Sequence, residues 1–274
     1  DMAVANGLSD DASVLLNNGD GTFTDETRYT AGDFPQSVAL GDLDGDGDLD
    51  MVVANWNSGD ASMLLNNGDG TFAPQTRDPA GDSPVSVVLG DLDGDGDLDM
   101  AVANYGGTDT SVLLNNGDGT FAAQSFYAAG VLPTSVALGD LDGDGDLDMA
   151  VVNFLGDDTS VLLNNGDGTF AAQTFYAAGD GPGSVALGDL DGDGDLDMAV
   201  ADWYSNSTSV LLNRCPASVC PADLNGDGIL DLVDINVFTT GFLASDPIAD
   251  LNGDGLLDLD DIAFFIAAFN AGCP

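Results

Sequence analysis

Aspartates alternate with other residues in a ten-residue segment, GDLDGDGDLD, that occurs at 41–50, 90–99, 139–148 and 188–197. Counted from its first aspartate, each copy carries carboxylates at positions 1, 3, 5, 7 and 9 and a glycine at position 6. Calcium takes about six to eight oxygen ligands, and a D-x-D-x-D-G loop curls so that its first, third and fifth side chains reach one ion. The glycine permits the sharp turn. The segment therefore predicts a calcium-binding loop.

The expected ligands of each loop follow from their positions. The first, third and fifth carboxylates, the seventh backbone carbonyl and the ninth carboxylate, directly or through water, are expected to surround the ion. These residues are Asp42, Asp44, Asp46, Asp48, Asp50, Asp91, Asp93, Asp95, Asp97, Asp99, Asp140, Asp142, Asp144, Asp146, Asp148, Asp189, Asp191, Asp193, Asp195 and Asp197. Asp and Gly also dominate ordinary turns, but so many adjacent carboxylates would repel one another without a counter-ion. Position twelve is Val53 in the first copy, which favours a loop between two strands over a loop between two helices.

The composition limits the classes of partner. The chain has 48 acidic residues, 3 basic residues and no His, for a formal net charge of −45. Nucleic acids and anionic membranes are bound through Lys and Arg, so neither is expected as a partner. Hydrophobic residues make up 44% of the 274 residues, enough for a core. We find no apolar run approaching the roughly 18 residues of a membrane span.

The loops belong to a 49-residue repeat that predicts four strands per copy. In one copy, short apolar runs bounded by turn residues lie at 37–40, 51–54 and 62–65, with a weaker run at 72–77. A period of this length with four strands indicates propeller blades. The expected fold is mainly β, a β-propeller of about four to five four-stranded blades over 1–213, followed by a small α-helical EF-hand-like module over 214–274.

A second turn motif, NNGDGTF, recurs at 17–23, 66–72, 115–121 and 164–170. Its Asn-Gly and Asp-Gly pairs suit a tight hairpin because these residues tolerate positive φ. We interpret the motif as structural, with a weaker cation contact through Asp69 or Asp118 as the alternative.

The pairing of VALGDLDGDGDLDMAVAN with SVLLNNGDGTF resembles the FG-GAP or VCBS repeats, over about 1–213. The resemblance implies a calcium-binding β-propeller like the integrin α-subunit head, with the calcium loop joining the first two strands of each blade. Such propellers generally have more blades than this chain supplies.

The copies of each strand are unequal in number. The chain opens inside the repeat, with Asp1 at the ninth loop position, and the last copy stops after Asn213, before its fourth strand. Three complete blades flanked by two incomplete ones are therefore expected. Unpaired strand edges are templates for another chain, so the incomplete blades either complement each other between subunits, giving a dimer or filament, or reflect processing or truncation.

An aromatic residue recurs six positions after the ninth loop residue, as Trp56, Tyr105, Phe154 and Trp203. These side chains either form stacking platforms for a sugar or fill the seams between blades, and repeat-equivalent aromatics favour packing.

A different duplication follows, with twelve-residue loops at 223–234 and 250–261. Oxygen-bearing side chains stand at positions 1, 3, 5, 9 and 12 and Gly at position 6, as in an EF-hand with Asp at position twelve. With the backbone carbonyl of position seven, the predicted ligands are Asp223, Asn225, Asp227, Ile229, Asp231, Asp234, Asp250, Asn252, Asp254, Leu256, Asp258 and Asp261. Each loop runs into an apolar helical stretch, with Ile235, Val237, Phe238 and Phe242 on one expected face and Ile262, Phe265, Ile266 and Phe269 on the other.

This pair of loops resembles a type I dockerin over 220–272. The resemblance implies a cohesin-like partner; the alternative is a module that packs on the propeller or joins subunits. A disulfide between Cys220 and Cys273, with Cys215 able to replace Cys220, would stabilise the module by roughly 4 kcal/mol. Such a bridge and weak calcium loops point to an extracellular setting.

No catalytic constellation is apparent, since His is absent and the acidic pairs belong to the loops. We therefore expect no enzyme, but a secreted, calcium-stabilised structural or adhesion protein with about six calcium ions, self-assembling head-to-tail as a homo-oligomer or filament. The alternative is a carbohydrate-binding propeller that recognises a glycan and is anchored through a dockerin-cohesin contact.

Overall fold

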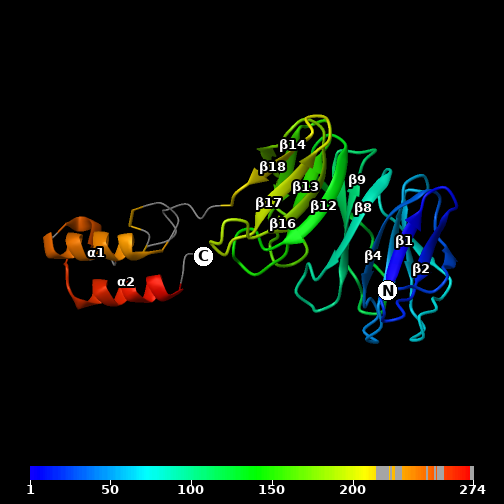
Figure 1. The fold of residues 1–274 in the computed structure, drawn as a ribbon, viewed down its shortest axis with the longest axis horizontal. Helices are drawn as coiled ribbons and strands as arrows, with labels where there is room; N and C mark the ends of the chain where they lie inside the picture. Colours follow the sequence, from blue (N-terminus) through cyan, green and yellow to red (C-terminus); the bar gives the residue numbers. More distant parts are fainter. Residues whose placement is uncertain are drawn as a thin grey trace. The chain divides into compact units, whose positions relative to one another are not determined.

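A computed structural model of the chain describes residues 1–213, 222, 224–225, 230–244, 246–249, 251 and 256–271 (Figure 1). The chain divides into two compact units, one of Asp1–Leu187 with Met198–Val210 and a second of Gly188–Asp197 with Leu211–Pro274. None of the helices in the described ranges is long and apolar enough to cross a membrane.

The strands form five antiparallel sheets in chain order, each a simple up-and-down meander. Their bounds are Met2–Asn6, Asp11–Leu15 and Thr27–Thr30 (β1–β3); Pro35–Gly41, Asp50–Asn55, Asp60–Leu64 and Thr76–Pro79 (β4–β7); Pro84–Gly90, Asp99–Asn104, Asp109–Leu113 and Ser125–Ala128 (β8–β11); Pro133–Gly139, Asp148–Asn153, Asp158–Leu162 and Thr174–Ala177 (β12–β15); and Pro182–Gly188, Asp197–Asp202 and Ser207–Leu211 (β16–β18). Three sheets have four strands, and the first and last have three. The mainly β class and the count of three complete blade-like sheets are confirmed.

The strand register of one sheet shows why the repeat folds this way. The second strand, β5, reads DMVVAN and is buried on both faces, which matches its nearly continuous apolar sequence. In the β4–β5 ladder Gly41 lies opposite Asp50, so residues 42–49 form the connecting loop. The predicted position between two strands is correct.

One predicted strand boundary is wrong. The weak run at 72–77 was expected to form the fourth strand, but β7 begins at Thr76. Phe72 instead makes an isolated antiparallel bridge with Asn66, and the backbone N–H of Asn67 donates to the carbonyl of Thr71 at 2.8 Å. The NNGDGTF motif therefore closes a small hairpin of its own, as its turn chemistry indicated.

Apolar cores lie between consecutive sheets, which stand side by side in the first unit (Figure 1). Met51, Met100 and Met149 occupy the same place in three successive sheets, and each is fully buried. Packing of sheet faces against each other in this serial manner is the arrangement of propeller blades.

The described part of the C-terminal region contains helices α1 (Leu232–Ala244) and α2 (Leu259–Ala271) and the 3-10 helix η1 (Pro247–Ala249). The rings of Phe238 and Phe265 stack in its core, with centroids 4.3 Å apart and planes 4° apart. Most of the predicted apolar residues pack around this pair, but Val237 and Ile266 do not belong to this core, which corrects the sequence prediction. Ile266 is 53% exposed, because residue 266 lies about 100° around the helix from residue 265.

Candidate metal centre

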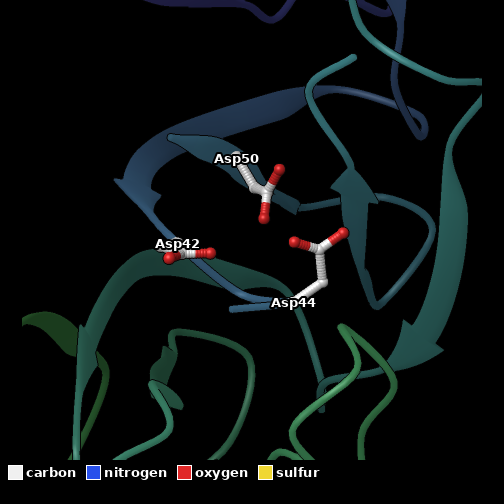
Figure 2. Close-up of side chains that lie close together, drawn as sticks. All are labelled: Asp42, Asp44 and Asp50. Atoms are coloured by element: carbon white, nitrogen blue, oxygen red, sulfur yellow. The ribbon is translucent and has the colours of Figure 1, made fainter. Parts of the chain in front are cut away.

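Each GDLDGDGDLD loop gathers three carboxylates. Oxygen atoms of Asp42, Asp44 and Asp50 lie within 4.8 Å of one another. The same holds for the repeat-equivalent triads Asp91, Asp93 and Asp99; Asp140, Asp142 and Asp148; and Asp189, Asp191 and Asp197. Figure 2 shows the three side chains close together in the first of these loops. These triads can hold a metal ion, and their hard oxygen donors suit a hard cation.

The ninth aspartate is the fixed part of each triad. The Asp50 side chain is fully buried at the start of β5. One of its oxygens accepts the backbone N–H of Leu43 at 2.8 Å, and the other accepts that of Asn66 at 2.7 Å. Because each carboxylate oxygen has a second lone pair, both can also face a cation. Asp99, Asp148 and Asp197 accept the equivalent pairs of N–H groups at 2.7–2.8 Å.

The first and third aspartates hold the curve of the loop. The two oxygens of Asp42 accept the backbone N–H groups of Gly45 and Gly47, each at 2.9 Å. Both glycines have positive φ, 75° and 93°, a conformation that other residues rarely adopt. Asp44 accepts the N–H of Asp46 at 3.2 Å. The predicted need for glycine at position six therefore has a direct structural reason.

The fifth and seventh aspartates lie outside the triad. Asp46 accepts the backbone N–H of Asp48 at 2.9 Å. The Asp48 carboxylate points instead toward the NNGDGTF hairpin, where a Cβ added to Gly68 would lie 2.9 Å from its Oδ2. The structure thus brings together the carboxylates of positions 1, 3 and 9 of the predicted ligand set in every repeat loop, and the carboxylate of position 5 is not part of that cluster. The backbone carbonyl expected at position 7 stays a prediction.

The sequence pattern did not reveal an asparagine that links neighbouring repeats. The Nδ2 of Asn115 donates to the carbonyl of Leu43 in the preceding sheet's loop at 2.8 Å and to that of Leu98 in its own loop at 3.2 Å. Asn164 does the same to Leu92 and Leu147. The signal was present as the first Asn of every NNGDGTF copy, but nothing local reveals a partner 72 residues away.

Burial makes the ninth carboxylate of three loops costly to ionise, as the pKa of Asp99 shows best. It raises the pKa of Asp99 from 3.8 to about 6, although hydrogen bonds from the backbone of Asn115 and Leu92 oppose the shift and the charges of Asp93 and Asp95 add to it. Burial likewise raises the pKa values of Asp50 and Asp148. A bound cation would compensate this penalty, since it favours the ionised form.

The hairpin aspartates are engaged within their own turns. Asp69 accepts both the backbone N–H of Thr71, at 3.0 Å, and its hydroxyl, at 2.6 Å. The hydroxyl bond, followed by the backbone bond, lowers the pKa of Asp69. Among the described residues neither Asp69 nor Asp118 joins an acidic cluster, which favours the structural interpretation of this motif.

The C-terminal loops are described only in part. Asp223, Asp227, Ile229, Asp250, Asn252 and Asp254, with all three cysteines, lie outside the described residues, while Asn225, Asp231, Asp234, Leu256, Asp258 and Asp261 lie within them. Asp231 accepts the N–H of Val233, and Asp234 accepts that of Asp231 at 3.0 Å. Asp261 accepts the N–H of Asp258 at 2.9 Å. Positions nine and twelve therefore cap the start of α1, in the manner of a capping box.

Comparison with known proteins identifies the repeat. The family model of the FG-GAP-like repeat matches residues 1–53, 42–102, 91–151 and 149–200. No curated protein matches the chain.

Several solved structures share the fold. A lectin from Agrocybe aegerita, which specifically recognises non-reducing terminal N-acetylglucosamine, is 24% identical with a TM-score of 0.50; the match covers 77% of this chain and 66% of the lectin. A functionally unknown protein from Desulfotomaculum acetoxidans is 12% identical, with a TM-score of 0.54 and coverages of 77% and 65%. Virginiamycin B lyase from Staphylococcus aureus is 12% identical, with a TM-score of 0.50 and coverages of 75% and 64%. The chain thus spans less than two thirds of the length of each.

Substitutions in one loop should separate ion binding from backbone support. We expect Asp93→Ala to abolish calcium binding at its loop while leaving the calcium-free protein nearly as stable, because Asp93 holds only a single exposed N–H. Asp99→Ala should also destabilise the calcium-free protein, by about 1–3 kcal/mol for each orphaned N–H. Calcium titration calorimetry and urea unfolding in EDTA measure the two effects. Equal loss of stability in both variants would contradict the assignment.

The raised pKa of Asp99 predicts that pH has opposite effects on two quantities. These are the stability of the calcium-free protein and the affinity of this loop for calcium. Without calcium, the folded pKa of about 6 exceeds the ordinary value of 3.8, so this group's contribution to stability falls as pH rises between those values. With calcium, protons compete for the carboxylate. The affinity of this loop should therefore weaken about tenfold from pH 7.5 to pH 5, as measured by calcium titration with circular dichroism to verify folding. A calcium affinity that does not change with pH would refute this prediction.

Proposed function

The chain belongs to the FG-GAP-like repeat family, and we propose that it is a secreted, calcium-stabilised adhesion or binding protein. The observation that carries the proposal is the buried ninth aspartate, repeated in four loops, which joins the first two strands of a sheet to the hairpin that follows. An ion held beside it would fix three chain segments at once. Binding is favoured over catalysis, since the acidic clusters of the described residues are those of the loops.

Calcium is the ion that the donor set favours. Carboxylate and carbonyl oxygens are the ligands that calcium takes, and its flexible coordination suits a loop that supplies three side chains. Extracellular calcium is abundant enough to fill weak sites, which supports the proposed location. Four ions would occupy the repeat loops and two more the loops at 223–234 and 250–261, about six in all.

Serial packing of the sheets supports a propeller in which each sheet is a blade. Among the described residues, β18 pairs only with β17, and no described strand covers its other edge. An open edge is a template for pairing, and we propose that a second copy of the chain supplies that strand, giving a homo-oligomer or filament.

The C-terminal module is the second candidate for a contact with a partner. Leu232 and Leu259 stand at the same position of the two loops and are 80% and 78% exposed. Paired exposed leucines favour a docking surface, which supports the cohesin-like partner implied by the resemblance to dockerins.

Leu232→Asp combined with Leu259→Asp should abolish binding to such a partner, and unchanged binding would exclude this surface.

Removal of calcium tests the main proposal. At a free calcium concentration of ten times the Kd, each site adds about 1.4 kcal/mol to the unfolding free energy, so four independent repeat sites contribute roughly 6 kcal/mol. We expect excess EDTA to lower the melting temperature sharply, and added calcium to restore it while magnesium does so less well. An identical melting curve in EDTA would refute calcium stabilisation.

Assembly is measured separately. Light scattering of the intact protein in calcium should show a dimer or larger species whose mass increases with concentration, because the proposed strand pairing is intermolecular. A strict monomer at high concentration would exclude assembly without affecting the calcium proposal.

A further inference from the structure

A pocket of about 690 Å³ lies within the first unit, at the strand ends opposite the metal loops. Three of its lining residues are the recurring aromatics Tyr105, Phe154 and Trp203, which follow β9, β13 and β17. Their backbone N–H groups donate to the carbonyls of Ser83, Leu132 and Gly181 at 2.8–3.1 Å, just before the first strand of each sheet. The repeat therefore delivers one aromatic side chain per sheet to the same end of the unit.

The aromatics differ in how far they are used for packing. Trp56 packs against Tyr105, with ring centroids 4.8 Å apart and planes 39° apart, and does not line the pocket, so the packing alternative holds for Trp56. Phe154 contacts the ring of Tyr204, with centroids 5.2 Å apart. Trp203 is 74% exposed. The sugar-platform alternative therefore fits the Trp203 end of the row and not Trp56.

One residue that lines the pocket, Gly183, differs in size from its equivalents in the other repeats. Gly183 replaces the side chains that the other sheets carry as Gln36, Val85 and Thr134. A Cβ at Gly183 would meet only the carbonyl oxygen of Ala201, at 3.9 Å, so the strand tolerates a side chain there. Since the fold is built with larger residues in three other sheets, the glycine is not needed for folding and its effect is to open space.

The polar residues of the pocket also differ from the repeat. Asp202 and Ser207 replace the pair that is Asn153 and Asp158 in the preceding sheet. Asp202 is 3% exposed, and its carboxylate is held by the hydroxyls of Ser207 and Ser209 at 3.2 and 2.7 Å and by the N–H of Gly179 at 3.1 Å. These hydrogen bonds fix the side chains of Asp202 and Ser207 on one side of the pocket, beside the aromatic rings.

Ser184 also lines the pocket, and the equivalent serines of the other sheets have hydroxyls that are hydrogen-bonded. The hydroxyl oxygens of Ser37, Ser86 and Ser135 each accept a backbone N–H from the next sheet, at 3.3–3.4 Å. The exposed Ser184 is the last of this series, and within the described residues its hydroxyl makes no hydrogen bond. It is therefore able to donate to, or accept from, a ligand in the pocket.

We propose that this pocket binds the ring of a neutral saccharide. Aromatic faces pack against the C–H groups of a sugar, while the hydroxyl of Ser184 hydrogen-bonds its hydroxyls and the oxygen of Ser207, which donates to Asp202, can accept from one of them. The residues that line the pocket include no basic group, and the chain has a net charge of −45, so an anionic ligand is disfavoured. A cation is less suited than a sugar, because Asp202 is the only lining carboxylate and already accepts three hydrogen bonds. The inference deepens the proposed binding function.

Blocking the pocket with a residue that the repeat itself uses gives a direct test. Gly183→Thr introduces the side chain of Thr134 and should fill the space without disturbing the strand. Trp203→Ala removes the exposed platform. Phe126→Ala is the matched control, since Phe126 is 55% exposed on β11 and does not line the pocket. Each protein, as the full chain in calcium, is titrated by calorimetry with the methyl glycosides of glucose, galactose, mannose and N-acetylglucosamine, and with tetramethylammonium.

We expect at least one glycoside to bind, with affinity lowered about tenfold or more by Gly183→Thr and by Trp203→Ala and unchanged by Phe126→Ala. The proposal is overturned if no glycoside binds at millimolar concentration, if only tetramethylammonium binds, or if binding survives both pocket variants. Thermal melting of the same samples verifies folding and keeps the two proposals distinct. A protein that melts in a calcium-dependent way but binds no glycoside overturns only the saccharide site.

Discussion

The fold of the repeats depends on one buried carboxylate in each of four sheets, Asp50, Asp99, Asp148 and Asp197. The ninth loop aspartate stands at the first residue of a central strand, fully buried, and accepts one N–H from its own loop and one from the next hairpin. A neutral acceptor could not satisfy both groups as well, because ionised acceptors make the stronger hydrogen bonds. In Asp99 the ionised form is disfavoured by burial and by the charges of Asp93 and Asp95, which raise its pKa. The conflict is relieved if a cation binds, and this is the physical basis of the proposed dependence on calcium.

Two of the loops are also hydrogen-bonded to the repeat that follows them, through Asn115 and Asn164. The amide of Asn115 reaches the loop of the preceding sheet through the carbonyl of Leu43, while its backbone N–H reaches Asp99 of its own sheet. One residue therefore couples two loops, and apolar cores lie between the same sheets. Stability in such serial arrays is shared between neighbours rather than held in one central core. An ion bound at one loop would consequently support the sheets on both sides of it.

The two ends of the sheets differ in how constant their residues are from repeat to repeat. At the loop end, the glycines, aspartates and asparagines are nearly identical from repeat to repeat, and the aspartates of positions 1, 3, 5 and 9 accept the same backbone N–H groups in each loop. At the opposite end, the turns after the second strands read NWNSGD, NYGGTD, NFLGDD and DWYSNS. Three of these turns contain one positive-φ residue, at Gly59, Asp157 and Asn206, and the side chains of all four turns vary. A scaffold that is constant at one end and variable at the other is suited to presenting different side chains to a ligand.

The repeat, most of its strands and the loop residues could be predicted from the amino-acid sequence, because they depend on local chemistry. Alternating aspartates with glycine at position six specify a tight acidic loop, and apolar runs bounded by turns specify three of the four strands. Even the incomplete first and last sheets could be counted from the repeat. The fourth strand was misplaced because Phe72 pairs within the hairpin rather than with the sheet. The packed structure was needed to show which aspartates converge, that Asn115 joins two repeats, and that Gly183 and Asp202 line a pocket with aromatics from three sheets. Those relationships connect residues tens of positions apart, and they are fixed by how sheets pack against each other rather than by the periodicity of any one segment.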